Sequence, residues 1–401
     1  MEKEIDLLKE SAIMNYKNKD FNRAINELDK IKTIDINYFE KNLKFYYLWS
    51  IYHTQIKIEK NLIESNYNKF QENVKYILHH TKKDDLLYNM TIMFVVEYLE
   101  SKSNYKACDL NKWLDKINPD TLNSESLSFK SSDGKKVSLS SQMEKWYSIK
   151  TRTLEKAEEY KECIKYCDMA LEKINDFHHN NDIWFQRTKA LCLWKSGNSK
   201  NAMEILKKIL NKKNEWFIQK EIGDILLETG KIEEAKRYYI DAALNNGPSE
   251  MKIKLFWNLA DIFEKKNMIE EEKQHRIFVL GLRQVYGWKL SSIEGEFKKT
   301  IPEKLLNEFN EKKYIKALRK IWESEKWDSG NIIEGIIDNL LPNGQSGFIS
   351  TKNKRYYFLT KEFKGKKEQL IPGLKVSFYL GEGFDKKKNI ETKVAVNIKL
   401  I

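Results

Sequence analysis

Hydrophobic residues recur at helical spacing through most of residues 1–328, among many lysines and glutamates. The chain has only five prolines in 401 residues, which agrees with long helices because helix interiors tolerate proline poorly. A finer pattern recurs in which one helix ends in a turn and the next begins with a small residue. It is found in residues 156–171, 194–210, 227–244 and 264–280. The pattern predicts a series of helical hairpins.

The small position at the start of the second helix gives the repeat its period. It is occupied by Cys163, Ala202, Ala235 and Glu272, which are 39, 33 and 37 residues apart. A further copy opens the chain, with Ala24 at the same position. Two-helix repeats have a period of about 34 residues, so the spacing predicts an α-solenoid.

The segment IGDILLETGKIEEAKRYYIDAAL resembles a tetratricopeptide repeat. The residues that match the small and large packing slots of the family are Gly223, Leu226, Gly230, Ala235, Tyr239 and Ala242. The fourth segment departs from the family, because Glu272 and Arg276 occupy slots that are usually small and apolar. The resemblance implies that the first helix of each hairpin faces a concave groove.

The groove that the resemblance implies would contain basic and aromatic side chains. They are Arg152, Trp184, Arg187, Trp194, Lys220, Asp224 and Trp257. Such a groove suits an acidic peptide or an unstacked base. Tryptophans at helical spacing more often pack between repeats, so both interpretations stay open.

The rest of the helical region is less regular. Residues 40–101 are expected to form degenerate repeats, and residues 120–142 form a polar insert. Within the insert, Asp133-Gly134 separates two short alternating runs, which predicts a β-hairpin. A last helix at 302–325 and the polar residues after it place a domain boundary near Ser329. We therefore expect a helical domain over residues 1–328.

The pattern changes to short strands over residues 331–401, where β-branched and aromatic residues alternate with polar ones. Five strands are predicted, with turns at Pro342-Asn343-Gly344, Asn353, Pro372-Gly373 and the lysine run 386–388. Five strands in a domain of this length are typical of an OB-type barrel. The period of a strand places Phe348 and Tyr357 together on the outer face and Ile349 and Phe358 in the core.

The segments GIIDN, SGFI, YYFLT, PGLKVSF and VAVNI occur in an order and spacing that resemble the cold-shock domain, over about one sixth of the chain. The resemblance implies that Phe348 and Tyr357 stack on bases of single-stranded RNA or DNA. The basic residues around them are expected to contact the phosphates. They are Lys352, Lys354, Arg355, Lys361 and Lys364, followed in the sequence by Lys366 and Lys367.

Three departures from the cold-shock pattern reduce this stacking platform. Asn339 stands where the family usually has a tryptophan, Ser346 replaces an aromatic residue, and Leu359 replaces a histidine. We therefore expect weak or partner-assisted binding.

The charge distribution agrees with an acidic partner. The formal net charge is +12, and the segment from Gly335 to Ile401 has 13 Lys and Arg against 6 Asp and Glu, or 13 − 6 = +7. The four cysteines show no CxxC spacing, and the adjacent His178 and His179 have no third ligand near them, so we expect no metal site and no cofactor. No apolar run is long enough for a membrane span, and we expect a cytoplasmic protein without a membrane partner.

A catalytic function is not indicated, because the sequence contains no GxxxxGK[ST], GxSxG or HExxH motif. We expect a non-enzymatic adaptor or regulator that binds a protein through the solenoid and RNA or single-stranded DNA through the barrel. One alternative is a pure protein scaffold, for example in a bacterial defence complex. In another alternative, the solenoid groove itself binds the nucleic acid.

Overall fold

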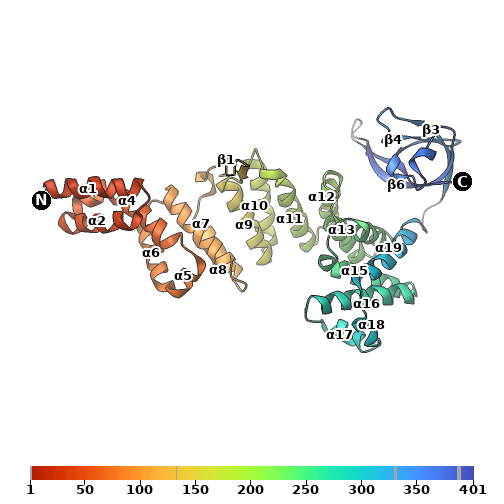
Figure 1. Cartoon of the computed structure of the whole chain (residues 1–401), viewed down its shortest axis with the longest axis horizontal. Helices are drawn as coiled ribbons and strands as arrows, with labels where there is room; N and C mark the ends of the chain where they lie inside the picture. Colours follow the sequence, from red (N-terminus) through yellow and green to blue (C-terminus); the bar gives the residue numbers. More distant parts are fainter. Residues whose placement is uncertain (1, 132, 329–331, 386–389) are drawn as a thin grey trace. The chain divides into compact units, whose positions relative to one another are not determined.

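The computed structural model describes residues 2–131, 133–328, 332–385 and 390–401. Helices dominate up to Asp328 and strands dominate from Ile333 onward (Figure 1). The chain divides into two compact units, Met1–Ile205 and Leu206–Ile401. The predicted fold class, a helical solenoid followed by a small β-barrel, is confirmed. Residues 329–331, where the domain boundary is predicted, lie outside the described residues.

In the first unit, helices pack mainly on their neighbours in the sequence. Their bounds are α1 (Glu2–Lys17), α2 (Phe21–Ile34), α3 (Ile36–Asn42), α4 (Lys44–Ile51), α5 (Lys60–Ser65), α6 (Tyr67–His80), α7 (Leu86–Glu100), α8 (Ala107–Leu114), α9 (Gln142–Lys156), α10 (Tyr160–Lys173) and α11 (Asp182–Lys195). Between α4 and α5 lies η1 (Tyr52–Ile56), a π-helix. The region predicted as degenerate repeats is thus largely helical. α12 (Ser199–Lys212) runs across the border of the two units.

The second unit continues with helix pairs and ends in the barrel. Its elements are α13 (Trp216–Glu228), α14 (Ile232–Leu244), α15 (Ile253–Lys265), α16 (Ile269–Val285), α17 (Ser292–Lys298), α18 (Lys304–Asn307), α19 (Glu311–Asp328), β3 (Ile333–Leu340), β4 (Ser346–Ser350), β5 (Arg355–Leu359), β6 (Lys375–Asp385) and β7 (Ile390–Leu400). α19 packs on α14 and α16.

One turn geometry recurs between the two helices of a pair. A residue with positive φ ends the first helix: Lys19 (64°), Glu158 (60°), Gly197 (85°), Gly230 (77°) and Asn267 (58°). The next N–H then bonds to a carbonyl five residues back at 2.8 or 2.9 Å, as from Lys231 to Leu226. This is the Schellman motif, which satisfies helix-end carbonyls through a left-handed residue. Each such residue lies five positions before the predicted small position, so the predicted repeat register agrees with the structure.

The hairpin of α13 and α14 shows why the small positions matter. A Cβ on Gly223 would lie 2.6 Å from Cε1 of Tyr239. Ala235 and Tyr239 are fully buried on α14, and Leu226 is almost so on α13. Glycine therefore lets the two helices approach until the tyrosine ring fills the gap.

The polar insert forms the predicted hairpin. β1 (Leu127–Lys130) pairs antiparallel with β2 (Lys136–Leu139), and Phe129 faces Val137. Gly134 has φ 78° in the turn, and residue 132 lies outside the described residues. His178 Nε2 donates to the carbonyl oxygen of Ser138 at 2.9 Å, so this histidine connects the hairpin to the segment before α11.

The five strands of the second unit form a closed barrel in the order β3-β4-β5-β7-β6, with β6 also paired to β3. β5 and β7 are parallel, and the other pairs are antiparallel. The core contains Ile337, Ile349, Phe358, Phe363, Leu370, Val376, Phe378, Ala395 and Ile398. The predicted inward direction of Ile349 and Phe358 is therefore confirmed. The predicted turn at the lysine run 386–388 lies outside the described residues.

Candidate nucleic-acid interface

Phe348 and Tyr357 lie directly opposite each other on β4 and β5. Their ring centroids are 5.6 Å apart and the rings meet edge to face at 71°. Both side chains are partly exposed, whereas their neighbours Ile349 and Phe358 are fully buried. The backbones of β3 and β4 come close here, because a Cβ on Gly347 would lie 2.5 Å from the Asn339 carbonyl oxygen. The two predicted aromatic residues thus share the outer face of adjacent strands.

Arg355 covers part of this aromatic pair. Its guanidinium carbon lies 4.3 Å from the ring centroid of Phe348, within the range of a cation–π contact. Nη2 of Arg355 pairs with the Asp338 carboxylate at 2.5 Å and donates to Asn339 Oδ1 at 2.8 Å. The cation expected to follow phosphates is therefore already paired with a carboxylate on β3.

The three departures from the cold-shock pattern have different places in the barrel. Asn339 faces Phe348 across β3 and β4 and accepts the hydrogen bond from Arg355. Ser346 is only 3% exposed, whereas Leu359, its partner on β5, is 38% exposed. The described aromatic surface of these two strands thus centres on Phe348 and Tyr357, whereas Tyr356 lies on the other face of β5 and packs against the core residue Phe378.

The predicted lysines are open to solvent. Lys352, Lys354, Lys361 and Lys364 are exposed and form no ion pair with any residue that the structure describes. Lys354 Nζ lies 5.9 Å from the ring centroid of Tyr356. Thr351 fixes the turn before β5, because its hydroxyl donates to the Lys354 carbonyl at 2.8 Å. These ammonium groups can approach phosphates without breaking an ion pair within the described chain.

Four predicted groove residues lie in the first unit. Arg152 pairs with Glu100 at 2.8 Å and donates to Ser148 Oγ at 3.1 Å. Trp184 is 38% exposed, and Lys195 Nζ lies 4.4 Å from the ring centroid of Trp194. Burial raises the pKa of Glu155, and the positive charge of Arg187 opposes this shift.

The other three lie in the second unit and are engaged in contacts within it. Lys220 and Asp224 pair with each other at 2.6 Å, and their side chains are 15% and 13% exposed. Asp224 Oδ1 also accepts from Tyr239 Oη at 2.7 Å and from Asn258 Nδ2 at 3.2 Å. The Lys220–Asp224 pair therefore belongs to a structural network between helices α13, α14 and α15.

Trp257 is covered by Arg276, whose guanidinium carbon lies 4.5 Å from its ring centroid. Arg276 pairs with Asp261 at 3.1 Å, with Glu264 at 2.8 Å and with Glu272. The two residues that depart from the repeat pattern, Glu272 and Arg276, thus form an ion pair with each other. Burial raises the pKa of Asp261, and Arg276 opposes that shift.

The sequence did not reveal an exposed apolar segment that runs from the last residue of α16 into α17. Val285, Tyr286, Trp288, Leu290 and Ile293 are between 36% and 66% exposed. The rings of Tyr286 and Trp288 stack with centroids 5.0 Å apart. The signal that could have indicated it is the loss of helical spacing after Gly287.

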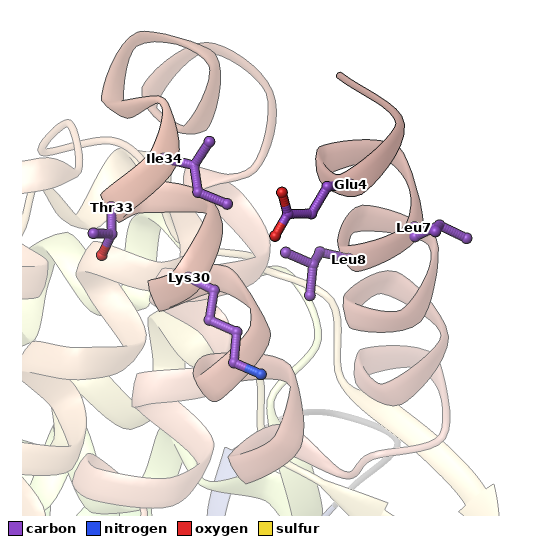
Figure 2. Close-up of a pocket in the computed structure, with 6 residues that line it drawn as sticks. All are labelled: Glu4, Leu7, Leu8, Lys30, Thr33 and Ile34. Atoms are coloured by element: carbon purple, nitrogen blue, oxygen red, sulfur yellow. The ribbon is translucent and has the colours of Figure 1, made fainter. Parts of the chain in front are cut away.

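A shallow pocket lies between α1 and α2 and is lined by Glu4, Leu7, Leu8, Lys30, Thr33 and Ile34 (Figure 2). None of these side chains has a buried polar atom without a partner among the described residues. Within the described ranges, no group of three or more His, Cys, Asp or Glu side chains could hold a metal ion. No helix in the described part of the chain is long and apolar enough to cross a membrane.

No protein-family model matches this chain, and no curated protein matches it. Solved structures show likeness at low identity. One is YrrB, a TPR protein with an unusual peptide-binding site, at 13% identity and a TM-score of 0.36 over 57% of this chain and 98% of that one. Another is BtubC from P. vanneervenii, at 9% identity and a TM-score of 0.39 over 59% and 95%. A third is PilF of Pseudomonas aeruginosa, at 14% identity and a TM-score of 0.31 over 75% and 99%. At TM-scores this low, none of these likenesses supports a conclusion about this chain.

Proposed function

We propose that this protein is a non-enzymatic adaptor that binds single-stranded RNA or DNA on its C-terminal barrel and a protein partner through its helices. The single observation that carries the proposal is the edge-to-face pair of Phe348 and Tyr357 on the outer face of β4 and β5. Aromatic side chains at such a place stack on unpaired bases, and each stacked base contributes about 1–3 kcal/mol.

The strand order supports an OB-type, cold-shock-like interpretation of the barrel. In OB barrels, the second and third strands form the face that binds oligonucleotides. β4 and β5 are the second and third strands of this barrel, and they carry both aromatic residues. The strand order and the aromatic pair thus favour the same face.

The charges around the pair suit a phosphate backbone. Four exposed lysines, Lys352, Lys354, Lys361 and Lys364, have no ion pair with a described residue. Arg355 is paired with Asp338, so it contributes to phosphate binding only when it leaves that carboxylate. A base can stack on Tyr357 directly, or on the guanidinium plane of Arg355 where it covers Phe348. Weak binding that falls with salt follows from this arrangement.

The helical part would supply the protein contact. Its proposed groove residues remain Arg152, Trp184, Arg187, Trp194, Lys220, Asp224 and Trp257, several of which also stabilise the helices. An adaptor can work with two weak sites, because linking them on one chain raises the effective concentration at the second site without any new contact.

Fluorescence anisotropy of the intact protein with a short labelled single-stranded RNA, and with its DNA equivalent, tests the proposal. We expect saturable binding at low salt that weakens at moderate salt. Affinity that does not change with salt would contradict a phosphate contact by the lysines.

The second candidate is a pure protein scaffold, in which the barrel serves protein contacts and the net charge is incidental. The observation that favours it is the Asp338–Arg355 pair, which neutralises the cation nearest to the aromatic pair. An absence of RNA and DNA binding at every salt concentration would favour this candidate.

A further inference from the structure

A second pocket lies within the first unit, and no function discussed so far uses it. It has a volume of about 340 Å³. Its lining residues are Tyr52, Lys57, Asn89, Met90, Met93, Phe94, Glu97, Leu122, Gln142 and Lys145. The volume is at the small end of the range of about 300–1,000 Å³ for ligand pockets. We refer to it as the Tyr52–Asn89 pocket.

Three elements supply most of the lining of the Tyr52–Asn89 pocket, and Leu122 lies outside them. One face of α7 supplies five of its residues, from Asn89 to Glu97, and the first turn of α9 supplies Gln142 and Lys145. The third wall is the π-helix η1, which begins at Tyr52. The N–H of Lys57 bonds to the Tyr52 carbonyl at 2.8 Å and ends this element. Single π-helical turns occur frequently at functional sites.

One polar atom of this pocket is buried without a partner, and the hydroxyl of Tyr52 forms no hydrogen bond with a described residue. Asn89 is 3% exposed, and its Nδ2 donates to Thr121 Oγ1 at 3.2 Å, but its Oδ1 has no hydrogen-bond partner among the described residues. Tyr52 is also 3% exposed, and its hydroxyl forms no hydrogen bond with a residue that the structure describes. Burial and the charge of Glu97 raise the pKa of Tyr52 to about 12, so the hydroxyl keeps its proton. An unpaired buried acceptor is costly, and a ligand that donates to it removes that cost.

The remaining lining is apolar inside and cationic at one edge. Met90, Met93 and Phe94 offer a soft surface for a flat ring, since thioethers make favourable contacts with aromatic systems. Lys57 is exposed and has no ion pair with a described residue. Lys145 pairs with Glu97 at 2.5 Å. One ammonium group is therefore available to a negative charge on the ligand.

We propose that the Tyr52–Asn89 pocket binds a small anion with a flat heterocyclic ring, of the class of the mononucleotides. The ring lies on Met90, Met93 and Phe94, and a ring or exocyclic N–H donates to Asn89 Oδ1. The Tyr52 hydroxyl donates to a ring nitrogen or carbonyl oxygen. The phosphate pairs with Lys57. This inference does not depend on the proposed function of the barrel.

Isothermal titration of the full chain with AMP, GMP, CMP and UMP tests the proposal, with the matching nucleosides as a second set. We expect at least one mononucleotide to bind with a Kd in the micromolar to low millimolar range, and its nucleoside to bind more weakly. The failure of all four mononucleotides at millimolar concentration would overturn the proposal.

Variants locate the binding. Tyr52→Phe keeps the buried ring and removes only the hydroxyl, and we expect it to weaken binding about three- to tenfold. We expect Lys57→Ala to weaken the binding of the nucleotide but not the binding of the nucleoside. Lys161→Ala, an exposed lysine on α10 that does not line the pocket, is the charge control. The double variant Phe348→Ala/Tyr357→Ala should bind the mononucleotide as the wild type does. Unchanged binding in both Tyr52→Phe and Lys57→Ala, or its loss in the barrel variant, would overturn the assignment.

Discussion

The guanidinium of Arg355 lies 4.3 Å from the ring centroid of Phe348. The position is fixed from β3, where Asp338 pairs with Arg355 at 2.5 Å and Asn339 accepts a further hydrogen bond. The side chain of Arg355 is still 51% exposed, so the pair is open to competition from phosphates. Asp338 therefore controls both the charge of the candidate interface and access to one of its two aromatic rings.

Removing the charge of Asp338 should strengthen nucleic-acid binding. In Asp338→Asn, we expect the affinity for single-stranded RNA to rise about three- to tenfold at low salt, because Arg355 becomes free to pair with a phosphate. The slope of log K against log salt should steepen by about 0.7, the value for one additional phosphate contact on a single strand. Anisotropy titrations at several salt concentrations measure both quantities.

Glu334→Gln is the matched control for that variant. It makes the same charge change on the same strand, and Glu334 has no ion pair with a described residue. An equal gain in both variants would show that only the net charge matters and that Arg355 has no special role.

Gly223→Ala should destabilise the second unit. The new Cβ would lie 2.6 Å from the Tyr239 ring, which is fully buried and cannot move away freely. We expect a loss of about 1–3 kcal/mol in the free energy of unfolding, measured in urea. Gly295→Ala in α17 is the control, because no atom lies within 4 Å of its added Cβ. That variant should be neutral or slightly stabilising.

The backbone conformation of the turns between helices leads to a second prediction about stability. Gly230 has φ 77° and open space around an added Cβ. Gly230→Ala should therefore lose about 0.5–1 kcal/mol, because the cost of the left-handed backbone exceeds the gain from the lower entropy of the unfolded chain. Glu158 adopts φ 60° with a side chain, so Glu158→Gly should gain about 0.5 kcal/mol after the entropy of glycine is counted. Urea unfolding of the two variants should give opposite signs. The same sign in both would contradict the role assigned to the turns.

His275 should make the stability of the second unit depend on pH. It is fully buried, its Nδ1 donates to the Glu271 carbonyl at 2.6 Å, and its Nε2 accepts from Trp322 Nε1 at 2.8 Å. Burial lowers its pKa from 6.5 to about 4. The unfolded chain therefore binds this proton more readily, so the contribution is complete above pH 6.5 and is lost as the pH falls towards 4. The free energy of unfolding should fall by about 3 kcal/mol over this range.

Urea unfolding of the wild type and of His275→Gln between these pH values checks this account. The fall in the free energy of unfolding should be smaller in the variant by about that amount. His179→Gln, at an exposed position on a loop, should keep the dependence of the wild type. Identical pH dependence in the wild type and in His275→Gln would contradict the role assigned to His275.

Local patterns in the sequence predicted the parts of the fold that local rules determine. The small residues at Cys163, Ala202 and Ala235 gave the register of the helix pairs, because helices approach closely only at such residues. Strand alternation placed Phe348 and Tyr357 outside and Ile349 and Phe358 in the core, because successive side chains point to opposite faces.

Contacts between distant segments could not be predicted in the same way. The Asp338–Arg355 pair depends on the register of β3, β4 and β5 and on the irregularity between Ile337 and Asn339. Arg276 on α16 covers Trp257 on α15. The Tyr52–Asn89 pocket is lined by elements that are some ninety positions apart in the chain. The Lys220–Asp224 pair is different, because its spacing of four residues on one helix is a recognisable pattern.

The most direct test of the central claim compares two variants in one anisotropy titration with labelled single-stranded RNA. The first is the barrel variant Phe348→Ala/Tyr357→Ala. The second is the charge-reversed variant Arg152→Glu/Arg187→Glu/Lys220→Glu. We expect the barrel variant to lose binding at every salt concentration, and the charge-reversed variant to retain it. Binding that survives in the barrel variant and disappears in the charge-reversed one would contradict the account and place the nucleic acid on the helices.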